Sequence, residues 1–170
     1  TLAGRKRVAL FGTNEHSLAD RLKEETYQRT IESSNLNNDS LIFRGCNPLC
    51  ECVDEFIDSF VENEIDAVIC ANDTVAIYLI NRMVKNGFNI PDDLYVIGMG
   101  NSCLAQKNSI PLSSIDFDYE ELGHRVFELW LCIRQDGVKV HAEITIPCRF
   151  ISRTSTDDFV CSELTIADEQ

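Results

Sequence analysis

Polar residues that could bind a ligand follow several short apolar runs in this 170-residue chain. The clearest example is "AVICANDTVA", in which an apolar run that begins at Ala67 stops at Asn72-Asp73-Thr74 before apolar residues resume. Such a break is typical of a strand that ends where a helix begins, and either Asn72 or Asp73 can cap that helix, which contributes about 1 kcal/mol. It is equally typical of a binding edge, because open α/β sheets bind ligands beyond the carboxyl ends of their strands.

The other candidate positions follow the other apolar runs and share amides, hydroxyls and small residues. They are Thr13-Asn14-Glu15, Arg44-Gly45, Gly98 to Asn101 and Asp116 to Asp118. None of these sets pairs a nucleophile with a neighbouring base, as covalent catalysis requires. The histidines, His16, His124 and His141, are scattered in the sequence. The residues therefore predict a binding site at this edge and no enzyme.

Alternating strand and helix patterns must position these residues. Strand patterns cover 7–12, 39–44, 66–71, 94–100 and 112–117, and a long extended segment covers 142–153. Helical spacing covers 17–33, 52–63, 74–87 and 119–137, with Gly87 as the residue that ends the third helix. On the first helix we expect Ser17 as the N-cap and one core face made of Leu18, Leu22, Tyr27 and Ile31. This alternation predicts an α/β fold, a doubly wound and mostly parallel sheet in a three-layer α/β/α arrangement.

The composition limits the classes of partner. The formal net charge of −13 predicts that these residues do not bind nucleic acid themselves. No apolar run approaches the roughly 20 residues that span a bilayer, so we expect no membrane association. Cys70, Cys103, Cys132 and Cys148 lie in or beside apolar patterns, as buried thiols do, which predicts a reduced, cytoplasmic setting.

Two motifs suggest a metal or a nucleotide, and both are weak. "CNPLCEC" (Cys46, Cys50, Cys52) lacks a paired C-x-x-C and a nearby histidine, so we expect no metal there. "GMGNSC" follows a strand, as the dinucleotide fingerprint does, and Asp118 stands about 20 residues beyond it. However, Cys103 occupies the third glycine position, and no clear amphipathic helix follows before Pro111. We therefore expect no cofactor.

The order of several segments resembles the effector-binding domain of the LacI/GalR family of bacterial transcription regulators. "DAVICANDTVAIYLINRMVKNGFNIPDDLYVIGMGN" resembles the family's strand ending in "-AND-", its helix, its "G…(I/V)P-D-(D/E)" turn and its strand "-V-V-G-(F/Y)-D-". "PLSSIDFDYEELGHRVFEL" resembles "P-L-T-T-…-ELG-…-A-…-L", and "IPCRFISRTST" resembles "P-x-x-L-(I/V)-x-R-x-S-T". The opening "RKRVALFG…SLADRLKEETYQ" resembles the strand and helix that begin the family's second lobe, so the resemblance covers roughly residues 5–156.

The resemblance implies a two-lobed module, like a periplasmic binding protein, with an effector between the lobes and a helix-turn-helix headpiece before it. Residues 1–156 would be mainly the second lobe and residues 157–170 an acidic tail, while the headpiece and most of the first lobe would lie upstream. Residues 118–147 would cross toward the first lobe. We therefore expect the apolar face of helix 119–136 to pack on a second copy or to be unusually exposed. That face comprises Leu122, Val126, Leu129 and Ile133.

The resemblance also implies site residues. Asn72 matches the effector-contacting Asn of "AND". Arg21 matches an Arg in the stretch "S-x-x-R-x-x-G-(F/W)", which binds ligand hydroxyls or carboxylates through its planar guanidinium. Thr26 and Tyr27 stand at the Gly and aromatic positions of that stretch.

One departure from the family pattern concerns the ligand. The family's sugar-binding Asp after the "V-G-(F/Y)" strand is Gly100 here, with Asn101 next. Either Asn101 substitutes for it, or the effector is not a simple sugar, or the site is degenerate. Asn14 and Asp73, which follow the first and third strands, complete the predicted effector-binding set.

The function implied is a switch. A small-molecule effector, a sugar or a related compound, would favour one arrangement of the lobes, and a homodimer would transmit the change to DNA through the headpiece. Helices at the edge of the lobe, notably 74–86, would form the dimer. The alternatives are a periplasmic solute-binding protein and a nucleotide-dependent enzyme that uses the "GMG" turn. The cysteines, the absence of a signal sequence at the start and the "AND…R-x-ST" pattern argue against the first.

Overall fold

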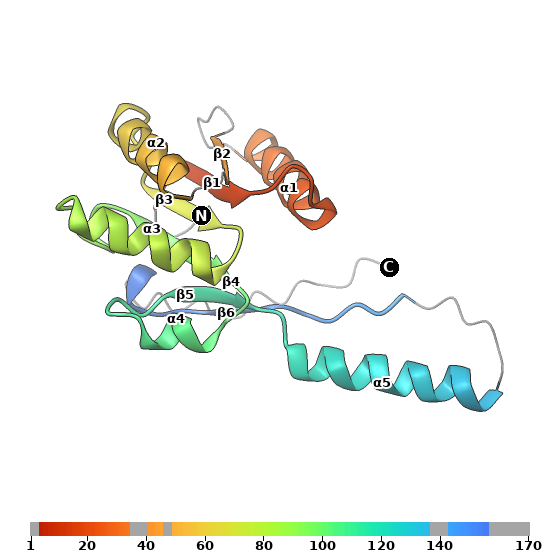
Figure 1. Ribbon diagram of the computed structural model, residues 1–170. Coiled ribbons are helices and arrows are strands. Elements are labelled where there is room, and N and C mark those ends of the chain that lie inside the picture. Colours follow the sequence, from red (N-terminus) through yellow and green to blue (C-terminus); the bar gives the residue numbers. More distant parts are fainter. Residues whose placement is uncertain (1–3, 35–40, 46–48, 137–142, 157–170) are drawn as a thin grey trace.

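A single six-stranded sheet organises the chain. The computed structural model describes residues 4–34, 41–45, 49–136 and 143–156. The strands are β1 (Val8–Thr13), β2 (Ile42–Arg44), β3 (Ala67–Cys70), β4 (Tyr95–Met99), β5 (Ser113–Asp116) and β6 (Arg149–Ile151). They lie in the order β2-β1-β3-β4-β5-β6, and all neighbours are parallel except β5 and β6 (Figure 1). The predicted fold class is confirmed, and the strand order reverses between β1 and β3.

Among the described residues, a helix follows each of the five parallel strands, and helices lie on both faces of the sheet. They are α1 (Leu18–Ser33), α2 (Leu49–Glu62), α3 (Asp73–Lys85), α4 (Cys103–Lys107) and α5 (Tyr119–Asp136), and a 3-10 turn covers Thr154–Thr156. The sequence did not predict α4, because five residues are too few to display helical periodicity. The predicted tail at 157–170 lies outside the described residues.

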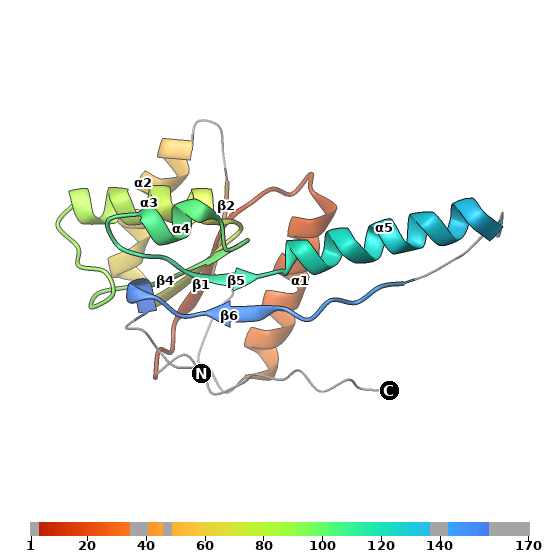
Figure 2. The same ribbon diagram turned by 90° about the horizontal axis from the view of Figure 1, so that it is seen from below.

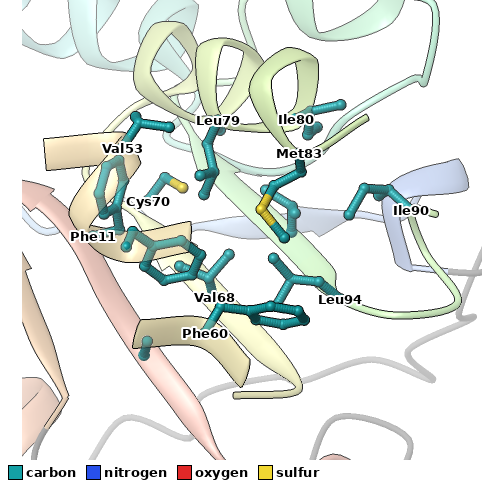
Figure 3. Close-up of a cluster of buried hydrophobic side chains, with 14 of the residues drawn as sticks. Phe11, Val53, Phe60, Val68, Cys70, Leu79, Ile80, Met83, Ile90 and Leu94 are labelled. Atoms are coloured by element: carbon teal, nitrogen blue, oxygen red, sulfur yellow. The ribbon is translucent and has the colours of Figure 1, made fainter. Parts of the chain in front are cut away.

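The main core lies between the sheet and the helices α2 and α3. Alternate residues of β1, Ala9 and Phe11, face this layer and are fully buried. The Phe11 ring meets Phe56 of α2 edge to face, with ring centroids 5.2 Å apart. Figure 3 shows the same cluster extending to Leu79 and Met83 of α3. The apolar stripes from which helices 52–63 and 74–87 were predicted are therefore the faces that pack in this core.

The opposite face is covered only in part, by α1. Leu10 of β1 packs there against Tyr27 and Ile31, and Figure 2 shows α1 on the side of the sheet opposite α3. The expectation that Leu18 and Leu22 share the core face is wrong, because they are 65% and 51% exposed. The buried stripe is Glu24, Tyr27 and Ile31.

The position of Leu22 follows from helix geometry. Residues advance about 100° around an α-helix, so Leu22 lies about 200° from Glu24 and cannot join its stripe. Leu22 instead lines an apolar hollow of about 620 Å³ between α1 and the sheet, together with Val8, Ile69 and Met99. This part of the sheet face is therefore not covered by a helix within the described residues.

Helix α5 projects away from the sheet (Figures 1 and 2). Five of its apolar side chains are between 39% and 56% exposed: Leu122, Val126, Phe127, Trp130 and Ile133. Leu129 is half-buried. The helix does not fold back on its own sheet, and its apolar face is exposed within this single chain (Figure 1).

One cysteine departs from the reduced state that we expected. Cys52 is buried and disulfide-bonded, whereas Cys70, Cys103, Cys132 and Cys148 are free. Cys103, Cys132 and Cys148 are exposed, although their apolar surroundings in the sequence predicted burial. Cys46 lies outside the described residues. Among the described residues, no group of three or more metal-ligating side chains comes together, and no helix is long and apolar enough to cross a membrane.

Candidate functional site

The carboxyl ends of β1 and β3 meet where the strand order reverses. In doubly wound sheets this is the position at which a crevice opens for a ligand. A chain of hydrogen bonds joins the two strand ends. Asp20 accepts from the backbone N–H of Asn14 (3.1 Å) and from the ammonium of Lys23 (2.8 Å). Lys23 also donates to the backbone oxygen of Ala71 at the end of β3 (3.0 Å).

Asn72 stands at the end of β3 and caps α3. Its Oδ1 accepts from the backbone N–H of Val75 (2.9 Å), and the helix begins at the next residue, Asp73. The side chain is exposed, and its Nδ2 has no hydrogen-bond partner among the described residues. The capping role predicted for this dipeptide therefore belongs to Asn72, and the capping geometry leaves an amide donor directed to solvent.

Asp73 lies beneath this edge and is only 3% exposed. Its Oδ1 accepts from the hydroxyl of Ser114 and its Oδ2 from the backbone N–H of Ser102, both at 2.6 Å. Both carboxylate oxygens are therefore occupied inside the protein. The structure places this predicted site residue as a support for the loop after β4, not as a group at the surface.

Gly98 of β4 is explained by the same carboxylate. A Cβ at this position would lie 2.3 Å from Oδ1 of Asp73 and 2.8 Å from Leu112. The absence of a side chain at Gly98 makes room for the carboxylate of Asp73. This carboxylate accepts from the N–H of Ser102, which is one of the donors that a bound phosphate would need. The "GMG" turn is thus filled by a carboxylate, which contradicts the dinucleotide alternative.

The loop after β4 is held at successive backbone positions. The N–H of Gly100 donates to Ile115 (2.8 Å), and the N–H of Asn101 donates to the hydroxyl of Ser114 (3.0 Å). Both residues have positive φ, +118° and +46°, which glycine and asparagine tolerate better than most residues do. The loop therefore presents Asn101 in a defined position, beside the Ser102 N–H that donates to Asp73.

Arg153, the arginine of the "R-x-S-T" motif, fixes the side chain of Asn101, a contact that the sequence did not predict. Its Nη2 donates to Oδ1 of Asn101 and its Nη1 to the backbone oxygen of Leu112, both at 2.6 Å. The backbone N–H of Arg153 donates to Ser113 (2.7 Å). The motif "RFISRTST" contains Arg153, but the sequence has no signal that pairs residues 52 positions apart.

Arg21 lies on the other side of α1 from Lys23. It lines a polar hollow of about 410 Å³ with Glu15, His16 and Arg44, and Asn72 is not among the residues that line it. Glu24 in this hollow is paired with Arg44 (2.7 Å). Hydrogen bonding from Arg44 lowers the pKa of Glu24 although burial opposes the shift.

Lys23, which the sequence did not indicate as a site residue, lies closer to Asn72 because it contacts the adjacent Ala71. The quoted stretch "R-x-x-G-(F/W)" contained the signal for it. With Thr26 at its Gly position, the residue at the arginine spacing, three positions earlier, is Lys23; with Arg21 at the arginine position, the Gly position is Glu24.

The polar end of β5 is occupied by an ion pair. Arg149 of β6 contacts Asp116 and Asp118, each at 3.2 Å. These predicted candidates hold together the two strands that connect the sheet to α5.

The arrangement of the chain is similar to that of known proteins. A family model described as a periplasmic binding protein-like domain matches residues 2–156. The chain belongs to this family.

Curated relatives in the family are regulators. The HTH-type transcriptional repressor PurR of Vibrio campbellii is 35% identical over 108 residues, an alignment that covers 62% of this chain and 32% of the repressor. The NTD biosynthesis operon regulator NtdR of Bacillus subtilis is 27% identical over 158 residues, which cover 90% of this chain and 47% of NtdR. The chain thus spans about a third to a half of the length of the curated relatives it matches. The resemblance to LacI/GalR-family regulators is confirmed.

Solved structures share the fold. The regulator CelR, in complex with cellobiose, superposes with a TM-score of 0.79 at 18% identity, over 90% of this chain and 47% of CelR. A LacI family regulator from Enterococcus faecium with bound ribose gives 0.76 at 22% identity, over 92% and 58% of the two chains. At these identities the similarity establishes the family fold for this chain, and nothing more.

Proposed function

We propose that this chain is the effector-binding part of a LacI-type transcription regulator. A small-molecule effector, a sugar or a related compound, binds at the edge formed by the carboxyl ends of β1, β3 and β4. The observation that carries the proposal is Asn72, whose oxygen caps α3 while its amide faces solvent where the strand order reverses. The curated relatives are named as regulators, and the chain acts by binding, not as an enzyme.

The contacts of the effector follow from the residues at this edge. Asn14, Asn72 and Asn101 contact the ligand with their side chains, and Lys23 or Arg21 supplies a cation. Asp73 and Gly100 contribute indirectly, since Asp73 holds the loop and Gly100 provides the positive φ that its backbone adopts.

Regulation of DNA binding by the effector requires a first lobe, a second subunit and a DNA-binding headpiece in addition to this lobe. Residues 1–156 form the second lobe of the effector domain, and residues 118–147 cross toward a first lobe. The exposed apolar face of α5 supports this division, because such a face is seldom left in contact with water. The protein acts as a homodimer in the cytoplasm, through helices such as α3, and it binds DNA through a separate N-terminal helix-turn-helix. Effector binding shifts the population of lobe arrangements.

The test separates the two roles of Asn72. A thermal-shift screen of sugars, phosphosugars and nucleosides on the full-length protein first identifies a ligand, since a ligand that binds the folded state raises the melting temperature. Asn72→Ala then removes both the cap and the amide. Asn72→Ser keeps a capping oxygen and removes only the amide.

We expect both variants to weaken effector binding by roughly tenfold, the effect of one lost hydrogen bond. Only Asn72→Ala should also lose about 1 kcal/mol of stability. If Asn72→Ala loses stability while the affinity for the ligand is unchanged in both variants, Asn72 is only a cap and the proposed site is wrong.

A further inference from the structure

Three asparagines at the binding edge share one arrangement. Asn14, Asn72 and Asn101 follow β1, β3 and β4, which are neighbours in the sheet. The Oδ1 of Asn14 accepts from the backbone N–H of His16 (3.0 Å), and that of Asn72 accepts from Val75 (2.9 Å). The Oδ1 of Asn101 accepts from Arg153 (2.6 Å). In each case the oxygen is used internally, and the NH2 group has no partner among the described residues.

The orientation of each amide is determined by its neighbour. An amide oxygen and nitrogen are distinguished by their hydrogen-bond partners. Here the partners are two backbone N–H groups and a guanidinium, which can only donate. A flipped amide would place two donors against each other, so the end of each amide that lacks a partner among the described residues is the NH2 donor.

The carboxylates of this edge are already paired. Asp20 is bound to Lys23, and Asp116 and Asp118 are bound to Arg149. Asp73 is buried under two donors from Ser102 and Ser114. The family's acceptor position is Gly100, which has no side chain.

Glu15 is the exception among these acids. Its side chain is 62% exposed and lies 3.9 Å from that of His16. It therefore remains able to accept a hydrogen bond, at one side of the edge only.

We propose that this edge selects an effector that presents hydrogen-bond acceptors, such as carboxylate, phosphate or oxo groups, over one that presents hydroxyl groups alone. The inference rests on the proposed function and adds the chemical class of the ligand. Oxygen atoms that only accept hydrogen bonds can pair with the three NH2 groups, and they bring no donor that would itself need a partner. A hydroxyl can accept from an asparagine, but its proton then needs an acceptor, and a buried donor without one weakens binding by roughly tenfold.

The first experiment compares matched ligands on the full-length protein. Isothermal titration calorimetry is run with galactose against galacturonate and with glucose against glucose 6-phosphate. We expect the acidic member of at least one pair to bind tenfold or more tightly than the neutral member. If the neutral sugars bind as tightly or more tightly, the inference is overturned and the proposed function stands. If none of these probes and no compound of the thermal-shift screen binds, both are overturned.

The second experiment replaces hydrogen-bond donors at this edge by acceptors and keeps the internal hydrogen bonds of Asn72 and Asn101. Asn72→Asp retains a capping oxygen, because aspartate caps a helix as well as asparagine does. Asn101→Asp retains an oxygen for Arg153. Each change replaces the NH2 donor by an acceptor. We expect the acidic ligand to bind at least tenfold more weakly to either variant, with no loss of melting temperature.

The control carries the same change of charge elsewhere. Asn89 is exposed and precedes β4, at the opposite end of the strands. Asn89→Asp should leave the affinity for the acidic ligand within about twofold, since solvent screens distant charges. An equal loss in the control, or no loss in Asn72→Asp and Asn101→Asp, would show that donor orientation does not select the ligand.

Discussion

The carboxylate of Asp73 stabilises the loop after β4, and replacing it tests how that loop is held. Asp73→Ala removes two hydrogen bonds to a charged acceptor, one from the Ser114 hydroxyl and one from the Ser102 N–H. The Ser114 oxygen can still accept from the N–H of Asn101. The N–H of Ser102 loses its bond and must find water.

The magnitude follows from these contacts. Hydrogen bonds to charged groups contribute about 1.5–3 kcal/mol each. An acidic residue in the first turn of a helix adds about 0.3–1 kcal/mol, which α3 also loses. The alanine variant no longer buries a charge, which offsets part of the loss. We expect a net loss of about 3 kcal/mol for Asp73→Ala, roughly three times that of Asn72→Ala, whose cap contributes about 1 kcal/mol.

Urea unfolding followed by circular dichroism measures the loss, with the wild-type and Asn72→Ala proteins as references. Hydrogen exchange supplies a local readout, because the N–H groups of Asn101 and Ser102 should lose protection while those of β1 retain it. A loss of stability below about 1 kcal/mol would refute the reasoning. So would unchanged protection at Ser102, because the loop would then be held by other contacts.

Three further properties follow from single side chains. Burial raises the pKa of the Cys70 thiol well above its usual range. Iodoacetamide should therefore label Cys103, Cys132 and Cys148 in the folded protein and Cys70 only after unfolding. Rapid labelling of Cys70 in the folded protein would contradict its burial. Arg44 lowers the pKa of Glu24, so their pairing stabilises the fold above pH ~4.3 and loses its effect as the pH falls through the lowered value. Glu24→Gln should therefore lower the melting temperature at pH 7, and the difference from wild type should narrow at pH 3; a constant difference would show that the charge of Glu24 is irrelevant. Trp130, the only tryptophan, is 46% exposed on α5. Its fluorescence emission should therefore shift to the blue when a second copy or another lobe covers that face. Emission that stays unchanged as the protein concentration is raised would exclude coverage by a second copy.

Periodicity predicted the elements that have a long apolar stripe. Helices α2 and α3 and the buried strands β3 and β4 lie within a few residues of the positions expected from the sequence. Their burial depends on residues close together in the chain, such as Val53 and Phe56, which share one face of α2. The error on α1 arises because periodicity alone does not show which face of a helix packs on the sheet. Leu18 and Leu22 are four residues apart and share a face, but that face lies outside the stripe that faces the sheet.

The sequence by itself also predicted the proposed site where polar residues follow the strands, because parallel strands bring their carboxyl ends to one edge. It placed Asn72 there and showed that the usual acidic position is Gly100. Only the tertiary structure decided which atoms remain available to a ligand. The partners of Asp73 are 29 and 41 positions away, and that of Asn101 is 52 positions away. Hydrogen bonds of this kind depend on the packing of the sheet, and local periodicity carries no information about them.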